Sequence, residues 1–398
     1  MSGHSEHDFE TAIEVGLLAS GGYEKRHPAD YDQTLALFPV DVIGFIKGSQ
    51  PTRWQQLETL LGARNQTTVL EALTKELEIK GALHVLRHGF KCYGKTLRQA
   101  YFRPNSGMNP EAAQRYVHNR LTITRQVSFT SVLKRPDGKP KRCIIDVTLA
   151  VNGLPVVTVE LKNPLTGQAA SEAIHQYQHD RDERDRLFAF KQRALVHFAV
   201  DPDEAWMTTR LKGRETVFLP FNRGRVHGAG NPPVAGNWKT HYLWDEVLNA
   251  DSLLDILQRF MRLEIKERKI TTDKGVRTVR KETMIFPRYH QLDAVRRLVG
   301  HARAHGSGHN YLVQHSAGSG KSNSIAWLAH RLASLHDAQE EKVFHSVVVV
   351  TDRRVLDQQL QNTIYQFEHK TGVVEKIDDD TRQLARALSG GTPIIIST

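Results

Sequence analysis

Two carboxylates and a lysine on neighbouring β-branched segments are the residues of this chain best suited to chemistry. Asp146 precedes an Asn-Gly pair at 152–153, and Glu160 and Lys162 follow that pair. An Asn-Gly pair between runs of β-branched residues predicts a tight β-hairpin. The segment 142–163 is therefore expected to form two antiparallel strands that carry all three side chains.

The register of this hairpin decides whether the two carboxylates meet. If the three residues 152–154 form the loop, Val151 pairs with Pro155 and Asp146 falls directly opposite Glu160. Opposite residues share a face, whereas a two-residue loop would shift the register by one and separate the carboxylates. The three-residue loop is favoured because it keeps the apolar residues on a single face, namely Ile145, Val147, Leu149, Val157, Val159 and Leu161. The opposite face then holds Asp146, Thr148, Thr158, Glu160 and Lys162.

Such a pair of carboxylates predicts a cation between them. Mg²⁺ is commonly held by one or two carboxylates together with water and substrate phosphate. A lysine on the same face can orient a water molecule and offset the charge that develops on a phosphate. Asp146, Glu160 and Lys162 thus predict metal-dependent phosphodiester hydrolysis. The alternative is a solvated hairpin face with a cross-strand glutamate–lysine pair, which the hairpin pattern alone does not exclude.

A glycine-rich loop further along the chain predicts a phosphate-binding site. It runs from His315 to Ser322, and its later residues Gly318, Ser319, Gly320 and Lys321 carry the pattern. Glycines let backbone N–H groups turn towards phosphates at the start of a helix. The lysine is expected to reach the β- and γ-phosphates of ATP, and the Ser322 hydroxyl to ligate Mg²⁺. Gln291 is a candidate for hydrogen bonding to the edge of the adenine base. The alternative for residues 315–322 is an ordinary Gly-Ser loop with an incidental lysine.

The composition of the chain restricts the class of protein. It has 398 residues, a formal net charge of +10, 39% hydrophobic residues and only two cysteines. The length suits two or three domains, and the positive charge favours a polyanionic partner. The sequence contains no segment of membrane-spanning length and no apolar signal region. Two cysteines are most simply reduced thiols in a cytoplasm.

The pattern of elements predicts two domains with a linker between them. The first is expected over residues 1–260, a charged linker over 261–285, and a parallel α/β unit over 286–398. Within the first, helices are expected at 9–22 and 53–80, a charged helix at 169–193, and strands at 121–133 and 194–200. Strands at 311–314, 347–350 and 394–396 are expected to alternate with helices at 324–335 and 356–367, as in a parallel sheet.

Together these segments resemble the R subunit, the motor and endonuclease subunit, of type I restriction enzymes over essentially the whole chain. The match rests on the order and spacing of several short motifs: Asp146 with Glu160-Leu-Lys162-Asn-Pro, Met207-Thr-Thr, Phe218-Leu-Pro-Phe-Asn, Gly228-Ala-Gly-Asn-Pro, Tyr242-Leu-Trp, Phe286-Pro-Arg-Tyr-His-Gln, His315 to Ser322, and Thr351-Asp-Arg-Arg. It implies an α/β fold: a PD-(D/E)xK nuclease-like domain followed by a RecA-like lobe of a superfamily 2 helicase, truncated before its DEAH-type box.

The resemblance also implies roles for single residues. Asp146 and Glu160 would be metal ligands and Lys162 the catalytic lysine. Glu10 resembles the helix glutamate that completes such sites, with Glu14 as a competitor. A glutamine–tyrosine element after the core is carried over as Gln176 and Tyr177.

The expected activity follows from the same resemblance. The parent enzyme would cut double-stranded DNA with Mg²⁺ after ATP-driven translocation, in complex with methyltransferase and specificity subunits. A chain without the DEAH-type box and second lobe is expected to bind ATP at most weakly and not to translocate. Two other functions stay open: a docking module for DNA or partner subunits without catalysis of its own, and a stand-alone NTPase. Three results would distinguish these functions. Loss of cutting in Asp146→Ala would indicate the nuclease, and salt-sensitive DNA binding without cutting would indicate the docking module. Loss of ATP turnover only in Lys321→Ala would indicate the stand-alone NTPase.

Overall fold

The chain divides into two compact units, which are described separately. The first contains residues 1–103 and 114–286, and the second residues 104–113 and 287–398. The computed structural model describes residues 6–163, 169–226, 228–272, 275–351, 360–361, 363–365, 372–377 and 381–397. Among them, no helix has the length and apolar character needed to span a membrane. Cys92 and Cys143 are both buried and are not joined in a disulfide.

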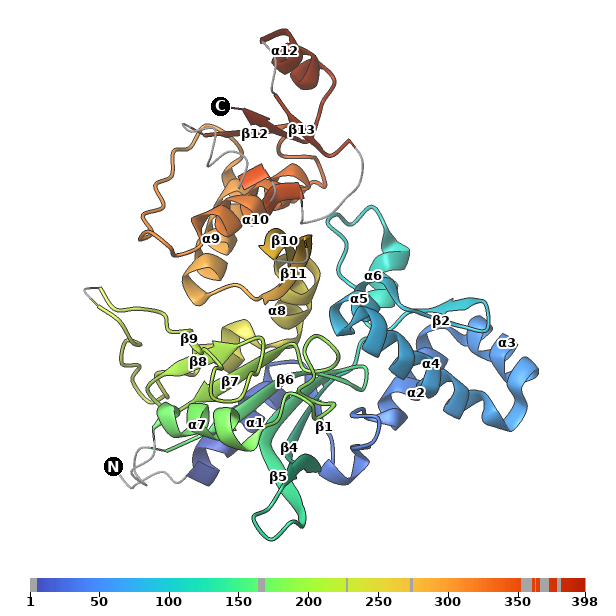
Figure 1. The fold of residues 1–398 in the computed structure, drawn as a ribbon. Coiled ribbons are helices and arrows are strands. Elements are labelled where there is room, and N and C mark those ends of the chain that lie inside the picture. The colour runs from blue at the N-terminus through green and yellow to red at the C-terminus, as the bar shows by residue number, and fades with distance from the viewer. Residues whose placement is uncertain are drawn as a thin grey trace. The chain divides into compact units, whose positions relative to one another are not determined.

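The first unit is built on one mixed sheet of seven strands in the order β1-β4-β5-β6-β7-β8-β9 (Figure 1). The strands are β1 (Tyr23–Lys25), β4 (Leu121–Lys134), β5 (Pro140–Val151), β6 (Leu154–Leu161), β7 (Val196–Val200), β8 (Ala205–Thr208) and β9 (Leu219–Pro220). β4, β5 and β6 are antiparallel, whereas β7 runs parallel to β6 and β1 parallel to β4. Every residue of β6 is buried, because this strand lies in the middle of the sheet.

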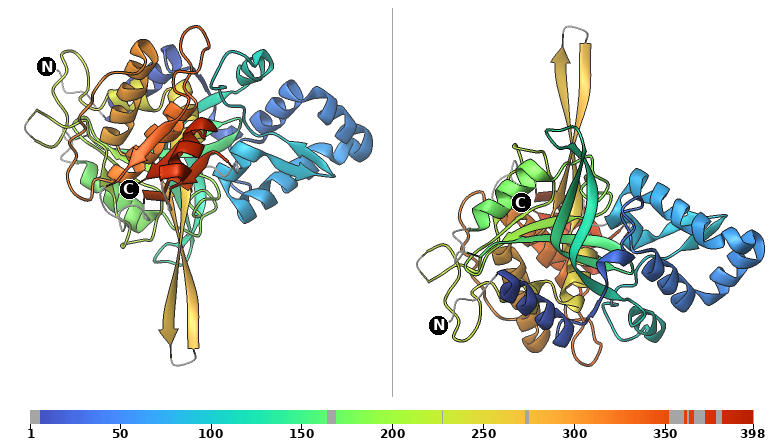
Figure 2. Two further views of the ribbon diagram at one scale, coloured as in Figure 1. Left: turned by 90° about the horizontal axis from the view of Figure 1, so that it is seen from above. Right: turned by 90° about the horizontal axis from the view of Figure 1, so that it is seen from below.

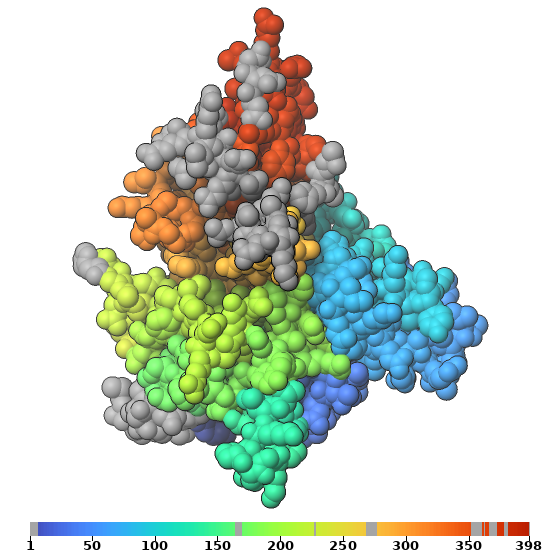
Figure 3. Space-filling model, in the orientation of Figure 1, coloured from blue at the N-terminus to red at the C-terminus, as the bar shows by residue number. Residues whose placement is uncertain are grey.

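Helices cover both faces of this sheet. α1 (Glu6–Ala19) lies on one face and α7 (Ala170–Asp180) on the other (Figure 2). The helices α2 (Pro39–Ser49), α3 (Pro51–Leu61), α4 (Asn65–Lys80) and α5 (Ala82–His88) form a lobe of their own, coloured blue in Figure 3. The small hairpin β2 (Phe90–Cys92) and β3 (Lys95–Leu97) belongs to this lobe, and α8 (Ala250–Asp255) follows later in the chain.

Two expectations for the first unit need correction, one for a helix and one for a linker. The charged helix expected at 169–193 is confirmed only as α7, which ends at Asp180 because Arg181 turns into an extended conformation. The segment 261–285, expected to be a linker, instead forms two paired strands, β10 (Arg262–Thr272) and β11 (Gly275–Ile285). Its many charges suggested a solvated connection, but β-branched residues between the charges also suit a strand.

The second unit contains a parallel sheet of three strands, as its alternating pattern predicts. The order is β12 (Val347–Val350), β14 (Ile394–Ser397) and β13 (Val374–Lys376), with β14 central and its isoleucines fully buried. The helices are α9 (Tyr289–His305), α10 (Lys321–Ala333) and α12 (Thr381–Ser389), and α6 (Pro110–Tyr116) begins in the 104–113 segment.

Two expectations for this unit are not met in full. Residues 311–314 do not form the expected strand, and Leu312 is 91% exposed. A strand requires a paired neighbour, and none of the described strands pairs with this segment. The helix expected at 356–367 falls largely outside the described residues; those that are described, 360–361 and 363–365, are helical.

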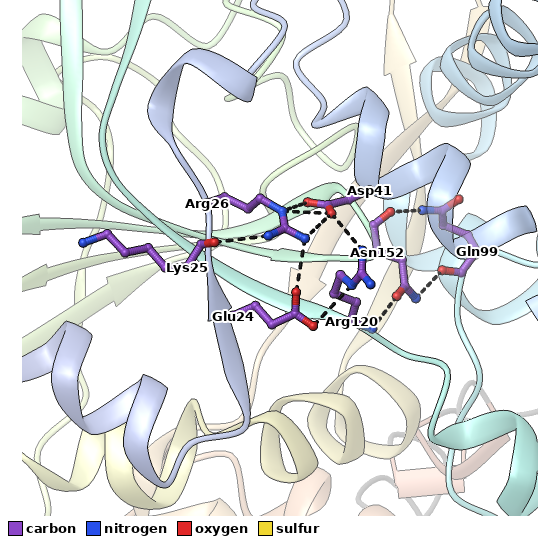
Figure 4. Close-up of polar contacts among 7 residues, drawn as sticks. All are labelled: Glu24, Lys25, Arg26, Asp41, Gln99, Arg120 and Asn152. Carbon is purple, nitrogen blue, oxygen red and sulfur yellow. Dashed lines mark hydrogen bonds and ion pairs between the residues drawn. The ribbon is translucent and has the colours of Figure 1, made fainter. Parts of the chain in front are cut away.

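The turn of the β5–β6 hairpin is tied to the surrounding structure by a buried polar network (Figure 4). Asn152 is fully buried in the left-handed region at φ 51°, and its Oδ1 accepts a hydrogen bond of 2.7 Å from the Arg120 backbone N–H. Its carbonyl oxygen accepts one of 2.9 Å from Gln99 Nε2. Nearby, the buried Asp41 carboxylate accepts hydrogen bonds of 2.7–2.9 Å from Arg26. These bonds fix the turn and hence the strands that leave it.

Gly153 is the residue at this turn that tolerates a side chain least. A Cβ there would lie 2.5 Å from the Phe38 carbonyl oxygen and 2.7 Å from the Val42 nitrogen, at φ +82°. Because both atoms belong to the backbone, we expect Gly153→Ala to lower the free energy of unfolding by about 2–4 kcal/mol in urea titrations. Gly138, in the β4–β5 turn at φ +78°, has no atom within 4 Å. The matched control Gly138→Ala should therefore cost only about 1 kcal/mol, and equal costs would contradict the role of the contact.

Candidate active site

The hairpin register brings Asp146 and Glu160 together, although the loop differs from the expected one. Val151 pairs with Leu154, so the loop has two residues, and an irregularity between Leu149 and Ala150 shifts the register by one. Beyond it Thr148 pairs with Thr158 and Val147 with Val159, which is the register that the three-residue loop predicted. The β-bulge thus compensates for the shorter loop.

The backbone pairing of β5 and β6 stops at Val147 and Val159, and the strands diverge into a fork at Asp146 and Glu160. Beyond that point a side chain replaces a backbone carbonyl of β5 as the hydrogen-bond acceptor for β6. The Oδ2 of Asp146 accepts a hydrogen bond of 2.8 Å from the Leu161 N–H. Glu160 is fully buried and Asp146 is half-buried. A solvated hairpin face is therefore excluded for these residues.

Arg181 fills this fork. Its Nε donates a hydrogen bond of 2.8 Å to Glu160 Oε1, and its Nη2 lies 2.7 Å from the same oxygen. Nη2 also donates to the Ile144 carbonyl, 2.7 Å away, which lies in the part of β5 that β6 no longer pairs with. The side chain of Arg181 is only 3% exposed, so this is a buried ion pair. Buried pairs of this kind are very sensitive to the loss of one partner.

The two carboxylates titrate as a coupled pair. Burial raises the pKa of Glu160 well above its ordinary value, and the neighbouring Asp146 carboxylate raises it further. Burial also raises the pKa of Asp146, against the opposing effects of the Leu161 N–H and the Lys162 ammonium. Two carboxylates beside one arginine cannot both ionise at their ordinary pKa values. A further cation at the fork would lower both pKa values.

The donor set at the fork fits a divalent cation held partly by solvent. Glu160 Oε2 is buried and accepts no hydrogen bond from any described residue, so one carboxylate oxygen remains for a ligand. No three His, Cys, Asp or Glu side chains among the described residues form a metal-binding group. Mg²⁺ does not require a complete protein cage, because water and phosphate oxygens commonly complete its shell.

Lys162 lies directly after the fork. Its backbone N–H donates to the Val200 carbonyl over 3.0 Å, which continues the β6–β7 pairing. Its side chain is half-buried, makes no hydrogen bond or ion pair with a described residue, and lowers the pKa of Asp146. The ammonium group is thus close to the carboxylates without being bonded to them.

Glu10 reaches the fork region from α1, whereas Glu14 is held elsewhere. The charge of Glu10 acts on the pKa of Asp146 and raises it. Arg125 Nη2 donates to Glu10 Oε2 over 2.7 Å, and Gln126 Nε2 donates to Glu10 Oε1 over 3.0 Å. Glu14 instead pairs with Lys25 at 3.0 Å, and Arg125 also reaches it at 3.2 Å.

Gln126 on β4 has a left-handed backbone conformation, with φ 56°. It lies between Arg125, which pairs with Val147, and Val127, which pairs with Ile145, and so faces the position of Asp146 on β5. Strained residues of this kind recur at functional sites.

Tyr177 and Gln176, the remaining candidates, differ in their surroundings. Tyr177 is fully buried in the apolar core, and its hydroxyl lies 2.9 Å from Thr158 Oγ1. Gln176, one residue earlier on α7, is half-buried. Thr158 Oγ1 also lies 2.7 Å from Nδ1 of the buried His197 on β7. Tyr177 and His197 therefore hold β6 from the α7 side, two residues before Glu160.

His197 should make the fold sensitive to acid. Burial lowers the pKa of its imidazole to about 3, whereas a histidine in the unfolded chain titrates near 6.5. The stability it contributes is complete above pH 6.5 and is lost as the pH falls towards 3, because only the unfolded chain takes up the proton. We expect His197→Gln to reduce the acid slope of the unfolding free energy by up to about 1.4 kcal/mol per pH unit. Urea titrations between pH 6.5 and 4.5 measure this slope, and identical slopes would contradict a neutral buried His197.

The glycine-rich loop of the second unit has the conformation that its sequence suggests. Gly318 and Gly320 have φ values of +75° and +84°, and α10 begins at Lys321. Lys321 Nζ donates to the carbonyl oxygens of His315 and Ser316, each at 3.0 Å. Ser322 lies half-buried in the first turn of α10.

Gln291 packs against this loop. Its Nε2 donates to the Ser319 carbonyl over 3.2 Å and to the Gly320 carbonyl over 3.0 Å. The candidates for nucleotide binding are therefore together in one unit.

Sequence reasoning identified the residues that hold the carboxylates only in part. The charged run 176–184 is most simply a solvated helix face, although its place after the hairpin could also bring Arg181 to the metal site. The structure shows Arg181 bonded to Glu160, a contact that depends on where α7 ends. Nothing in the sequence marks the unusual backbone of Gln126. An arginine inside a β-branched strand, at Arg125, is the one signal that would have suggested a buried carboxylate partner nearby.

The fold and the site define a two-unit α/β protein, with a buried carboxylate–lysine site in one unit and a glycine-rich lysine loop in the other. The chain belongs to the type I restriction enzyme R protein N-terminus family, whose model matches residues 5–216. Residues 290–398 match the SWI2/SNF2 ATPase family model.

Curated relatives agree with this assignment. The chain is 28% identical over 249 residues to the type I restriction enzyme HindI endonuclease subunit of Haemophilus influenzae, covering 62% of this chain and 21% of the relative. It is 27% identical over 231 residues to a putative type I restriction enzyme MjaVIIIP endonuclease subunit of Methanocaldococcus jannaschii, covering 57% and 20%. A type I restriction endonuclease subunit of Staphylococcus aureus is 26% identical over 285 residues, covering 70% and 26%. The chain thus spans about a fifth to a quarter of the length of these relatives.

Proposed function

We propose that this chain is the endonuclease portion, with part of the motor, of an ATP-driven type I restriction R subunit. The observation that carries the proposal is the fork, where Asp146 and the buried Glu160 lie near the ammonium of Lys162, which pairs with no described residue. The elements α1, β4, β5, β6, α7 and β7 follow one another in the order of the PD-(D/E)xK nuclease fold expected from the sequence, with the elements from β1 to α6 inserted between α1 and β4. The family assignment and the endonuclease relatives support the same role.

Each residue at the fork has a defined task in phosphodiester hydrolysis. Asp146 and Glu160 would hold Mg²⁺, which when bound supplies a Lewis acid and lowers the pKa of a water molecule. Arg181 fixes the Glu160 carboxylate through Oε1 and leaves Oε2 for the ion. Lys162 would orient the attacking water and offset charge on the phosphate. We assign the role of the helix carboxylate that completes the site to Glu10. Gln176 and Tyr177 are assigned to the glutamine–tyrosine element that follows the core.

The second unit is proposed to bind ATP. Gly318, Ser319, Gly320 and Lys321 would surround the phosphates, Ser322 would ligate the associated Mg²⁺, and Gln291 would face the adenine. The match to the SWI2/SNF2 ATPase model supports this assignment. Lys321 must exchange its bonds to the loop carbonyls for bonds to phosphate when the nucleotide binds. Double-stranded DNA and the methyltransferase and specificity subunits are the proposed partners in the cytoplasm.

Incubation of supercoiled plasmid with the chain and Mg²⁺ or Mn²⁺ tests the nuclease assignment. We expect nicking by the wild type and none by Asp146→Ala, while Lys162→Ala should retain metal binding and lose cutting. Glu10→Ala and Glu14→Ala compare the two candidate helix carboxylates, which share Arg125, and the larger loss of cutting is expected in Glu10→Ala. Nicking that persists in Asp146→Ala would contradict the proposed site. Absence of nicking by every protein, with DNA binding intact, would favour the docking module instead.

A further inference from the structure

The strands β10 and β11 form a ribbon that no other described strand joins. They pair with each other over their full length, from Arg262 with Ile285 to Thr272 with Gly275, and belong to no larger sheet. Figure 2 shows this long ribbon extending away from the seven-stranded sheet. An isolated two-stranded ribbon of this length contributes little to stability by itself. A role other than stability would explain its presence.

The base of the ribbon is firmly attached to the first unit. Lys191 Nζ lies 2.5 Å from Glu282 Oε2, and Thr209 Oγ1 donates to the Met284 carbonyl over 2.8 Å. Phe286, directly after β11, packs its ring against Phe198 and Phe221 at centroid distances of 5.9 and 6.0 Å. The base of the ribbon is therefore bonded to and packed against the first unit.

The two faces of the ribbon differ in charge. The segment from Arg262 to Ile285 contains eight basic and four acidic residues. The register places Lys266, Arg277 and Lys281 on one face, all exposed. Glu267, Arg280 and Glu282 share the other face, where Arg280 pairs with Glu282 at 3.2 Å. The first face is therefore cationic and the second is nearly neutral.

The cationic face contains an unfavourable pair. Lys266 and Lys281 are directly opposite each other in the register, and like charges at such positions destabilise a sheet. Glu264 pairs with Lys266 at 2.9 Å and with Arg262 at 3.3 Å. Neither Arg277 nor Lys281 forms an ion pair with any described residue. A polyanion on this face would remove the repulsion.

We propose that the β10–β11 ribbon is an arm that contacts the phosphate groups of duplex DNA through its Lys266, Arg277 and Lys281 face. The proposal extends the proposed DNA-cutting function and depends on it for the identity of the polyanion. Eleven-residue strands at roughly 3.4 Å per residue span about one turn of B-DNA. The major groove admits a two-stranded ribbon, and phosphate contacts fix position without reading sequence.

Binding of a fluorescently labelled 30-base-pair duplex of arbitrary sequence to the full chain tests the arm by anisotropy at several salt concentrations. We expect Lys281→Ala to weaken binding about fivefold and to reduce the slope of log affinity against log salt by about one. Arg280→Ala is the matched control, since it removes one exposed cation from the adjacent position on the other face. It should weaken binding less than twofold. The melting temperature of Lys281→Ala should not fall, because the substitution relieves the repulsion with Lys266.

Three outcomes would contradict the proposal that the ribbon binds DNA. They are equal weakening by both variants, no weakening by Lys281→Ala, and no duplex binding by the wild type. The second is also the result expected if the ribbon docks on a partner protein. None of them affects the plasmid-nicking and metal-binding results at Asp146, so failure of the arm and failure of the proposed nuclease are distinguishable.

Discussion

Arg181→Ala is expected to lower the free energy of unfolding by about 3–5 kcal/mol. The substitution leaves the Glu160 carboxylate buried without its partner and removes the donor to the Ile144 carbonyl. It also raises the pKa of Glu160 further, because the guanidinium is the main group that opposes burial there. Urea unfolding followed by circular dichroism measures the loss.

Two companion variants separate the buried pair from a general charge effect. Arg184→Ala removes an arginine three residues later whose partner is Asp182. Its side chain is 69% exposed, so no measurable loss of stability is expected. Glu160→Gln combined with Arg181→Ala removes the buried charge and should recover part of the stability. A loss in Arg181→Ala that the second substitution does not reduce would contradict the ion-pair explanation.

The sequence predicted the catalytic hairpin because strand register follows from local rules. The apolar alternation of residues 145–149 and 157–161 permits only one arrangement that keeps the apolar side chains on one face, although the structure buries both faces of β6. That argument gave the register of Val147 with Val159, the pair next to Asp146 and Glu160, even though it assumed the wrong loop. The bulge near Ala150 could not be foreseen, because it depends on how Asn152 and Gly153 are held by Gln99 and Phe38.

Long-range contacts account for what the sequence did not reveal. Arg181 is 21 residues from Glu160, and Gln126 is 116 residues from Glu10. No periodicity links positions so far apart, and the same charges on an exposed helix would have no such role. The strand expected at 311–314 illustrates the opposite error, since its apolar residues suit a strand but no described strand lies beside it. Local propensity forms a sheet only where partners exist.

Mg²⁺ is expected to stabilise the protein more at pH 8 than at pH 5.5, and Asp146→Asn should abolish the difference. Burial raises the pKa of Asp146 and of Glu160 above their ordinary values of 3.8 and 4.5. Without a metal ion, the stability linked to these protons is present in acid and is lost as the pH rises through the raised pKa values. Mg²⁺ binds the deprotonated carboxylates and therefore competes with protons. It binds best at a pH above the raised pKa values, where both carboxylates have lost their protons.

The size and the control of this effect follow from the same linkage. At a concentration 100-fold above its dissociation constant, a ligand that binds only the folded protein adds about 2.7 kcal/mol, which is several degrees in melting temperature. Thermal unfolding with and without Mg²⁺ at both pH values measures it. Asp146→Asn removes the repulsion with Glu160, so this variant should be more stable than the wild type at pH 8 without Mg²⁺ and should gain nothing from the ion. A variant that is less stable than the wild type without metal, yet still responds to Mg²⁺, would mean that Asp146 supports the fork without binding the ion.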